Sequence, residues 1–467
     1  MRAHEAGAMH GDFGGHGPNW LRMPVDINDL LPHLWAKTVN RAPSGALSVG
    51  GVEAGDLAAE FGTPAYVVDE ADFRFRLRAF ADGFGSAFPG GKVYYAGKSF
   101  LCKAVVRWVA EEGLNLDVCT GGELATALAA DFPADRLAFH GNNKSVAELT
   151  AALDAGVGTV VLDSFTEIDR LTTLARERGV RPRVMIRTKV GVEAHTHEYI
   201  ATAHEDQKFG LSLPASARAV RKVLSEDALE LRGLHSHIGS QIFETTAFEV
   251  AARRVLELHN AIRVELGVEL PELDLGGGFG MAYTTQDDPE TPARLADELR
   301  KIVDHECAAL GIEPPAITVE PGRAISGPST FTLYEVGTVK SVDLGAGQVR
   351  SYVSVDGGMS DNVRTALYDA SYSATLASRL SQAPPILARI AGKHCEAGDI
   401  VVKDEFLPGD IAAGDLVAVP GTGAYCRSMA SNYNHVPRPP VIAVADGAAR
   451  VIVRRETVDD LLNLDVG

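Results

Sequence analysis

Residues 92–98 read KVYYAGK, a short run of mostly apolar residues that ends in glycine and lysine. Such a run, bounded by a turn residue, is typical of a buried strand. The pattern recurs down the chain, and longer stretches with apolar residues at helical spacing separate most of the runs. Eight strand-like runs are present: Lys92–Ala96, Leu114–Val118, Leu137–His140, Thr159–Leu162, Arg183–Thr188, Leu231–Ser236, Glu272–Leu275 and Ile317–Glu320. This alternation predicts an α/β fold with a closed (β/α)8 barrel of the TIM type.

Sequence beyond about residue 330 has a different pattern, with short strands separated by Gly, Pro and Asp, which predicts a C-terminal β domain, a sandwich or barrel. Trp35–Ala58 has no barrel character and is expected to join the β domain, with Thr63–Asp69 leading into the barrel. The predicted boundaries are a flexible tail at 1–25, a segment joining the β domain at 26–70, the barrel at 71–328 and the β domain at 329–467.

Composition narrows the class of protein. Hydrophobic residues make up 46% of the chain and charged residues 23%, which is typical of a folded globular protein. A formal net charge of -18 argues against nucleic acid or an anionic membrane as partner. The five cysteines form no CxxC pair, and the first residues lack the apolar run of a secretory signal. We therefore expect reduced thiols and a cytoplasmic location.

The ends of the predicted strands carry the polar residues, and in a barrel of this type the C-terminal ends of the strands hold the active site. Lys98 follows the first strand, although a single lysine there is more often a solvated charge. The seventh strand runs into Gly276-Gly277-Gly278, whose backbone N–H groups could approach an anion. The eighth ends in Glu320-Pro321-Gly322-Arg323. Together the last two loops predict a phosphate site.

The sixth strand ends in His235-Ser236-His237-Ile238-Gly239-Ser240, which places both histidines on one face. Satisfied structural histidines are one interpretation. A metal site is another, with His195, His197 or His204 as further ligands, but we expect no metal. The loop His140–Lys144 could be a polar helix start.

A lysine, an acid, an imidazole and a phosphate site together favour pyridoxal 5′-phosphate, which needs a Schiff-base lysine and a partner for its pyridine nitrogen. Lys98 would hold the cofactor, Glu320 would face the pyridine nitrogen and His237 would stack on the ring. The phosphate would be bound by Ser240, Gly276, Gly277, Gly278 and Arg323.

These motifs, in this order, resemble the fold-type III pyridoxal-phosphate decarboxylases, which include the ornithine, arginine and diaminopimelate decarboxylases. The resemblance covers nearly the whole chain from about Gly62 and includes Gly322 among the matched residues. Cys395-Glu396-Ala397-Gly398-Asp399 and Gly423-Ala424-Tyr425 in the β domain match as well. The resemblance implies that Cys395 donates a proton to the substrate carbon and that Tyr425 contacts the cofactor and the substrate.

Within that family, residues 355–359 (VDGGM) followed by Arg364 and Tyr368 resemble the diaminopimelate branch. The resemblance implies that Arg323, Arg364 and Tyr368 bind a distal carboxylate and that Glu396 binds the distal ammonium. Residues 190–197 and 208–210 further resemble the actinobacterial form. Two departures are Val363 and Thr365, where prolines are frequent, and a longer N-terminal tail.

The resemblance therefore implies decarboxylation of meso-2,6-diaminopimelate to L-lysine and carbon dioxide, the last step of lysine biosynthesis. It also implies a homodimer with shared active sites, in which the partner subunit supplies Cys395 and Glu396. Alternatives are another decarboxylase of the family, acting on ornithine, arginine or carboxynorspermidine, an amino-acid racemase on the same barrel, a non-catalytic relative, and a metal-dependent barrel hydrolase.

Overall fold

The structure is a computed structural model and describes residues 18, 21–191, 208–243, 246–345 and 348–467. Most of the predicted tail at 1–25, together with His195, His197 and His204, therefore lies outside the described residues. The chain divides into two compact units. The β unit comprises Met1–Phe73, Met281–Asp288 and Ile325–Gly467, and the barrel unit comprises Arg74–Gly280 and Pro289–Ala324.

Eight parallel strands close the barrel unit, as predicted. Their sheet order is β9-β11-β12-β13-β5-β6-β7-β8, and β8 pairs back onto β9. The strands are β5 (Lys92–Ala96), β6 (Asn115–Val118), β7 (Leu137–Phe139), β8 (Thr159–Leu162), β9 (Arg183–Lys189), β11 (Glu230–His235), β12 (Glu272–Asp274) and β13 (Ala316–Val319). The two-residue strand β10 (Leu211–Ser212) pairs in parallel with the C-terminal end of β9. The predicted strand bounds agree with these at half of the strand ends and differ by one residue at the other half.

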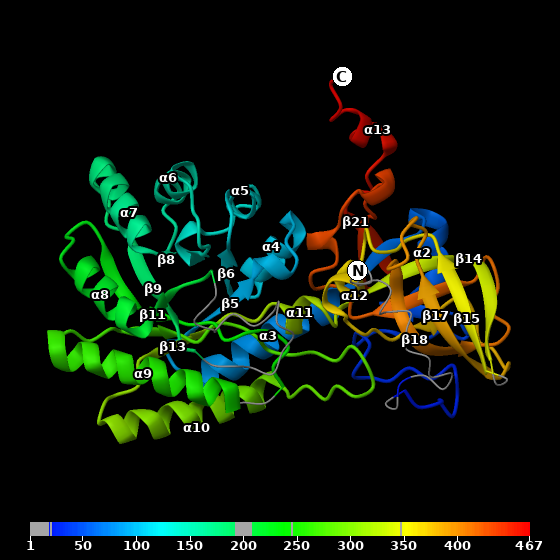
Figure 1. Ribbon diagram of the computed structural model, residues 1–467, viewed down its shortest axis with the longest axis horizontal. Helices are drawn as coiled ribbons and strands as arrows, with labels where there is room; N and C mark the ends of the chain where they lie inside the picture. The colour runs from blue at the N-terminus through cyan, green and yellow to red at the C-terminus, as the bar shows by residue number, and fades with distance from the viewer. Residues whose placement is uncertain (1–17, 19–20, 192–207, 244–245, 346–347) are drawn as a thin grey trace. The chain divides into compact units, whose positions relative to one another are not determined.

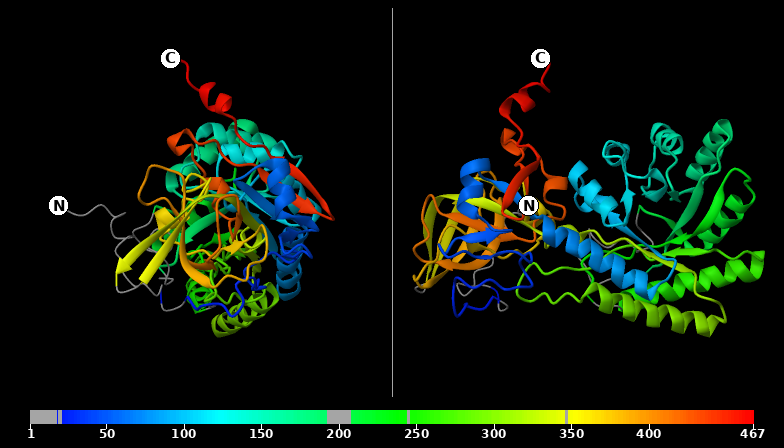
Figure 2. Two further views of the ribbon diagram at one scale, coloured as in Figure 1. Left: turned by 90° about the vertical axis from the view of Figure 1, so that its right-hand side faces the viewer. Right: turned by 180° about the vertical axis from the view of Figure 1, so that it is seen from behind.

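Helices surround the barrel strands (Figure 1). They are α3 (Glu70–Ala87), α4 (Lys103–Glu111), α5 (Gly121–Leu128), α6 (Val146–Ala155), α7 (Phe165–Arg178), α8 (Leu213–Leu224), α9 (Thr246–Leu266) and α10 (Pro292–Leu310). Local sequence fixes several of their ends. Ser145 and Glu148 form a capping box at the start of α6, and Gly156 ends that helix in the left-handed conformation. Helices α9 and α10 lie side by side (Figure 2).

The β unit is built on a sheet with the order β18-β17-β15-β14-β4-β20-β21. Its strands are β4 (Ala65–Asp69), β14 (Thr330–Gly345), β15 (Gln348–Val355), β17 (Pro385–Ala391), β18 (Ile400–Pro408), β20 (Val441–Ala445) and β21 (Ala448–Val453), and β19 (Leu416–Pro420) also pairs with β14. Shorter elements are β1 (Asn40–Arg41), β2 (Leu47–Val49), β3 (Val52–Glu53), β16 (Thr375–Leu376), α2 (Ala54–Phe61), α11 (Arg323–Ser326), α12 (Arg364–Tyr368) and α13 (Val458–Leu462).

A buried hydrophobic cluster joins the N-terminal segment to the sheet of the β unit. Trp35, Leu47 and Val67 from the N-terminal segment share a buried cluster with Phe331 and Ile442. The N-terminal segment is thus part of this unit, because burying these side chains against the sheet removes apolar surface from water. Strand β4 lies between β14 and β20 before the chain enters α3. The predicted connection at residues 63–69 therefore contains β4, which is an interior strand of the sheet of the β unit.

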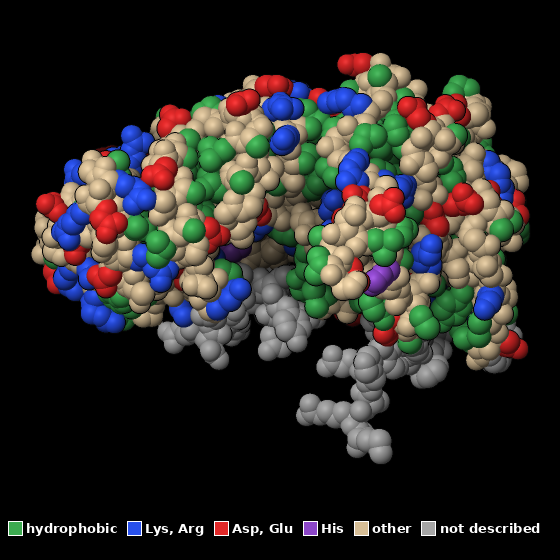
Figure 3. Space-filling model, turned by 90° about the horizontal axis from the view of Figure 1, so that it is seen from above, with side chains coloured by type: hydrophobic (Ala, Val, Ile, Leu, Met, Phe, Trp, Pro, Cys, Tyr) green, Lys and Arg blue, Asp and Glu red, His purple; other side chains and the backbone are tan. Residues whose placement is uncertain are grey.

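Acidic and basic side chains are interspersed over the barrel unit on the face shown in Figure 3. Among the described helices, none has both the length and the apolar character needed to cross a membrane.

Candidate active site

Lys98 lies on a 3-10 turn, Gly97–Ser99, directly after β5. The Gly97 N–H donates to Asp117 Oδ1 at 3.2 Å, and the Ser99 hydroxyl donates to the Ala96 carbonyl at 2.8 Å. A Cβ on Gly97 would lie 2.7 Å from the Asp117 carbonyl oxygen, so the turn packs directly on β6. These contacts fix the backbone that carries Lys98 at the C-terminal end of the barrel strands.

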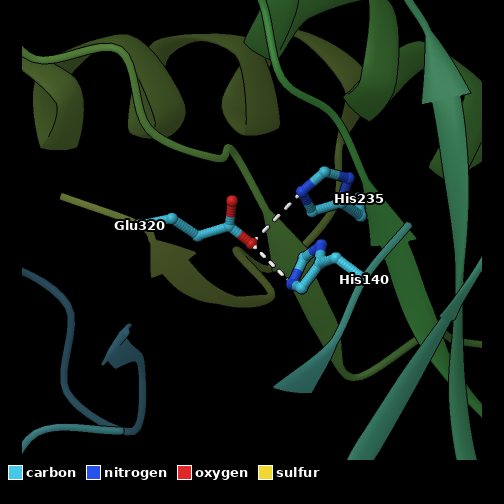
Figure 4. Close-up of side chains that lie close together, drawn as sticks. All are labelled: His140, His235 and Glu320. Atoms are coloured by element: carbon cyan, nitrogen blue, oxygen red, sulfur yellow. Dashed lines mark ion pairs between the residues drawn. The ribbon is translucent and has the colours of Figure 1, made fainter. Parts of the chain in front are cut away.

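Glu320 follows β13, and one oxygen of its carboxylate faces the rings of both His140 and His235 (Figure 4). Its Oε1 is 3.1 Å from His140 Nε2 and 3.2 Å from His235 Nε2, and all three side chains are buried. Although these distances are those of ion pairs, Oε1 has no hydrogen bond of good geometry among the described residues. Glu320 therefore offers a buried acceptor oxygen that a ligand N–H could use.

The pKa values of Glu320 and His235 indicate which of the two side chains is charged at neutral pH. Burial acts to raise the pKa of Glu320, but His140 and His235 outweigh it and hold that pKa well below its usual range. Burial lowers the pKa of His235 to about 4, against the opposing charge of Glu320. At neutral pH we thus take Glu320 as ionised and His235 as neutral. His235 then stabilises the carboxylate as a polar neighbour and not as a full positive charge.

Two more buried carboxyl groups face the same cluster. Burial, followed by the charge of Glu320, raises the pKa of Asp117 to about 7. The same two causes raise the pKa of Asp274 well above its usual range, and a hydrogen bond shared with Glu320 adds to the shift. Like charges so close together cannot all ionise in a buried site, so we expect Asp274 to keep its proton while Glu320 carries the charge.

The glycine loop after β12 is packed so closely that side chains do not fit. A Cβ on Gly276 would lie 2.5 Å from the Ser236 carbonyl oxygen, and one on Gly277 would lie 2.3 Å from the Glu320 carbonyl oxygen. Gly276 and Gly278 also have positive φ angles of 71° and 115°. The loop can therefore bring backbone N–H groups close to an anion.

His237 is held against this loop. The Gly277 N–H donates to His237 Nδ1 at 3.2 Å, so the proton of the neutral ring is on Nε2. Burial, with the nearby charges of Lys98 and Arg187, lowers the pKa of His237 well below its usual value. His237 is a neutral, oriented ring at neutral pH.

Ser240 and Arg323 meet beside the glycine loop. The Ser240 hydroxyl accepts from Arg323 Nε at 3.1 Å and from Nη2 at 2.8 Å, and Arg323 is 5% exposed. Gly322 packs against the turn of Lys98, since a Cβ there would lie 3.0 Å from Ser99 Oγ. Lys98, His237, Ser240, Gly276–Gly278 and Glu320–Arg323 are all at the C-terminal ends of the barrel strands.

The β unit carries the other predicted residues. Arg364 starts α12 and is buried, with its guanidinium donating to the Tyr372 hydroxyl at 2.5 Å. Its guanidinium carbon lies 4.7 Å from the centre of the Tyr283 ring. Burial acts to lower the pKa of Arg364, but Tyr283 and Tyr372 outweigh it and raise that pKa. Tyr368 is the last residue of α12 and is half-buried.

Cys395 and Glu396 share one turn of the β unit. Cys395 is exposed, and its backbone N–H donates to Asn434 Oδ1 at 3.1 Å. Glu396 is half-buried, and its Oε1 accepts from the Gly398 N–H at 3.4 Å. Tyr425 is half-buried with a φ of 64°, an uncommon conformation for a residue with a side chain. Such a conformation occurs often at functional sites.

Sequence reasoning missed Asp117 and Asp274, and gave His140 and His235 no role at the acid. Asp117 is the one carboxyl residue of NLDV at 115–118, and Asp274 ends ELD at 272–274, where the other acid, Glu272, pairs with Lys92 and Arg232. That pattern was the available signal, because a carboxyl on a buried strand needs a partner.

His140, His235 and Glu320 are also the group, within the described residues, whose ligand atoms could hold a metal ion, since they lie within 4.8 Å of one another. His237, which sequence reasoning considered as a ligand, is not part of this group. Two histidines and a glutamate are a known zinc ligand set, so geometry alone leaves this alternative open.

Comparison with known proteins decides between these alternatives. Residues 72–327 match the family model described as pyridoxal-dependent decarboxylase, pyridoxal binding domain. The chain belongs to the pyridoxal-dependent decarboxylases. Its cofactor is pyridoxal 5′-phosphate, as the motifs predicted. Membership of the family explains why the acid, the histidines and the glycine loop converge at one end of the barrel.

Several members of the family are similar over nearly their whole length. Diaminopimelate decarboxylase of Mycobacterium tuberculosis (strain ATCC 25618 / H37Rv) is 57% identical over 449 residues, which cover 94% of this chain and 100% of the relative. The enzyme of that name from Bacillus subtilis (strain 168) is 45% identical over 424 residues, which cover 90% of this chain and 95% of the relative. The mycobacterial match confirms the predicted likeness to the actinobacterial form.

Solved structures confirm the predicted fold of this decarboxylase. The crystal structure of diaminopimelate decarboxylase from M. jannaschii in complex with L-lysine matches with a TM-score of 0.85 and 29% identity. The match covers 92% of this chain and 98% of that one.

Proposed function

We propose that the protein decarboxylates meso-2,6-diaminopimelate to L-lysine and carbon dioxide, the last step of lysine biosynthesis. The observation that carries the substrate is the 57% identity, over 94% of this chain, to a relative named diaminopimelate decarboxylase. A relative crystallised with L-lysine also supports it, because lysine is the product of this reaction.

The residues of the barrel unit fit pyridoxal 5′-phosphate. The buried Glu320 Oε1 lacks a hydrogen bond of good geometry among the described residues and suits a protonated pyridine nitrogen. The tightly packed glycines 276–278, with Ser240 and Arg323, suit a phosphate. When bound, the cofactor supplies a ring that accepts the electron pair left by the departing carbon dioxide.

Each residue of the barrel unit then has a proposed task. Lys98 Nζ would hold the cofactor at its aldehyde group, and His237 would orient the cofactor ring. Glu320 keeps the proton on the pyridine nitrogen, because a carboxylate beside a ring N–H favours the protonated ring. Gly276, Gly277, Gly278, Gly322, Ser240 and Arg323 fix the phosphate end.

The β unit is proposed to choose the substrate. Arg364 and Tyr368, with Arg323, bind the distal carboxylate, and Glu396 binds the distal ammonium. An arginine can bind a carboxylate through two charge-assisted hydrogen bonds. Ornithine has no carboxylate at its distal end and could not use this site. Cys395 Sγ returns a proton to the α-carbon, and Tyr425 contacts the cofactor and the substrate. Buried aromatic rings beside Arg364 support a role that needs a fixed guanidinium.

The assembly and the division of labour are also proposals. We infer a homodimer in which Cys395 and Glu396 act in the partner's active site, in the cytoplasm. Residues 71–328 would bind the cofactor, and residues 329–467, joined by 26–70, would contact the substrate. The family match over 72–327 supports the first assignment. Mixing Lys98→Ala and Cys395→Ala subunits should restore about a quarter of the activity, because half of the dimers are mixed and each holds one intact site.

The function is tested by incubating the holoenzyme separately with meso-diaminopimelate, L-ornithine and L-arginine. Carbon dioxide and L-lysine from the first substrate alone are the expected result. Greater turnover of ornithine or arginine would instead assign the chain to another branch of the family. Arg364→Lys should raise the KM for diaminopimelate without changing the absorbance of the bound cofactor, because lysine cannot replace the planar guanidinium.

A further inference from the structure

The turn that carries Cys395 and Glu396 is closed by Asp399. The Asp399 N–H donates to the Glu396 carbonyl at 3.1 Å, and the Asp399 side chain is buried. Its Oδ2 accepts the N–H of His394, directly before Cys395, at 2.7 Å. One residue therefore fixes both ends of this turn.

The other carboxylate oxygen of Asp399 binds a different segment. Asp399 Oδ1 accepts the Met359 N–H at 2.6 Å. Met359 belongs to the loop at 357–362, which follows β15 and leads into α12 with Arg364 and Tyr368. Two further contacts join the same segments: the Lys393 N–H donates to the Gly357 carbonyl at 2.9 Å, and His394 Nε2 is 2.9 Å from Ser360 Oγ.

Two glycines make room for this carboxylate. A Cβ on Gly392 would lie 2.2 Å from Asp399 Oδ2, and one on Gly358 would lie 2.5 Å from Oδ1. Gly392 has an ordinary φ, so an alanine there would be strained only by contact with Asp399. The carboxylate is thus enclosed by backbone on both sides and cannot shift without moving one of the two segments.

We propose that Asp399 is a positioning residue that holds the Cys395–Glu396 turn and the loop at 357–362 as one rigid block. The inference rests on the proposed function, because that function makes Cys395 the proton donor and assigns Arg364 and Tyr368 to the distal carboxylate. In the proposed dimer, Cys395 and Glu396 act in the partner's active site, whereas Arg364 and Tyr368 act with Arg323 of their own subunit. Asp399 would then position groups that serve two neighbouring active sites.

The chemistry of the side chain makes the proposal specific. Both oxygens accept a backbone N–H, which an ionised carboxylate can do and an amide cannot, because an amide has one acceptor oxygen and an NH2 donor. Asp399→Asn should therefore keep the hydrogen bond to one of the two segments, at Met359 or at His394, and lose the other. Asp399→Ala should release both. Asp415→Asn is the matched control, since Asp415 accepts the Ala412 N–H at 3.0 Å in a different turn of the same unit.

The first measurement is amide hydrogen exchange of the holoenzyme, followed in peptides that cover 357–362 and 393–399. Asp399→Ala should speed exchange in both peptides by about fivefold or more, because the Met359 and His394 N–H groups lose their acceptor. The control should leave both unchanged. Unchanged exchange in the 357–362 peptide of Asp399→Ala would overturn the proposal, since the two segments would then not be coupled.

The second measurement is turnover of diaminopimelate. Asp399→Ala should lower kcat by about 10- to 100-fold, as displacement of a reacting group can do, and should raise KM as well. The absorbance of the bound cofactor should stay as in the wild type. Loosened segments with wild-type kcat and KM would overturn the positioning role. Absence of diaminopimelate turnover in the wild type would refute the proposed function alone, because the exchange result does not depend on it.

A double-mutant cycle covers the case in which Asp399→Ala fails to fold. Gly392→Ala pushes a methyl group into the Asp399 carboxylate and should reproduce the faster exchange and the lower kcat. The same substitution combined with Asp399→Ser, which removes the crowded carboxylate, should add little further loss. Fully additive losses would contradict the contact between Gly392 and the carboxylate on which the proposal depends.

Discussion

Asp274 offers a sharp test of the protonation pattern in the barrel. Its side chain is 3% exposed, its Oδ1 accepts the Gly276 N–H at 2.7 Å, and it shares a hydrogen bond with Glu320. If Asp274 is a neutral carboxylic acid, asparagine can replace it, since the amide oxygen accepts from Gly276 and the amide NH2 donates to Glu320. Leucine has a similar size but can do neither.

The contacts set the size of the effect. In Asp274→Leu, the buried Gly276 N–H loses its acceptor at a cost of about 1–3 kcal/mol, and the Glu320 carboxylate loses a donor worth about 1.5–3 kcal/mol. A loss of about 3 kcal/mol or more corresponds to a fall in Tm of roughly 6 °C or more for a unit of this size. Asp274→Asn should shift the Tm by less than about 2 °C.

The assay is thermal unfolding of the holoenzyme with saturating pyridoxal phosphate, followed by circular dichroism and by cofactor absorbance. Asp297→Asn, at a side chain that is 75% exposed on α10, is the control. A Tm for Asp274→Asn as low as that of Asp274→Leu would refute the reasoning. It would mean that the ionised carboxylate is the form that the fold needs.

Four further predictions concern the same site. Lys98→Ala should abolish the visible absorbance of the lysine-bound cofactor, whereas Lys103→Ala, five residues on and exposed, should keep it. Gly277→Ala should raise the Kd for pyridoxal phosphate, because its Cβ would lie 2.3 Å from a backbone oxygen, whereas Gly85→Ala, with open space around it, should not. Because the pKa of Asp117 is raised to about 7 in the fold, the wild type loses stability as the pH rises from about 4 to about 7. Asp117→Asn removes that loss. Between about pH 4 and about pH 8, the free energy of unfolding of the variant should therefore rise relative to that of the wild type by at most ~4 kcal/mol. Thermal unfolding at the two pH values would show this as a relative rise in the Tm of the variant. Prolonged dialysis against a chelator should leave activity intact and the protein without stoichiometric metal, and loss of activity restored by zinc would favour the ligand group His140, His235 and Glu320.

The barrel could be predicted from sequence because its signals are local. Each strand is a short apolar run. The capping box that begins helix α6 and the glycine that ends it can both be read from the sequence. The strands of the β unit are harder to predict from sequence. Strand β17 starts at Pro385, directly after Pro384, and it contains the buried Arg389, so its sequence reads as a turn with a charged residue. Only pairing with β15 and β18 makes it a strand.

The candidate site divides in the same way. The motif residues Lys98, His237, Gly276–Gly278 and Glu320 can be recognised in the sequence. Each lies at the end of an apolar run that the sequence predicts to be a barrel strand. A carboxyl on a buried strand indicates that Asp117 and Asp274 need partners, but the sequence does not identify those partners, because they are distant in the chain. Asp274 matters through Glu320, and Asp399 matters through Met359, contacts that no local pattern encodes.

The sequence by itself therefore determined the barrel, the family and the cofactor, since periodicity and ordered motifs are properties of the chain. Tertiary structure decided which carboxyl group in the buried cluster carries the charge and which keeps a proton. It also decided that one aspartate fastens two loops of the β unit. The physical reason is that protonation and positioning depend on burial and on the nearest charges, which exist only once strands distant in sequence have come together.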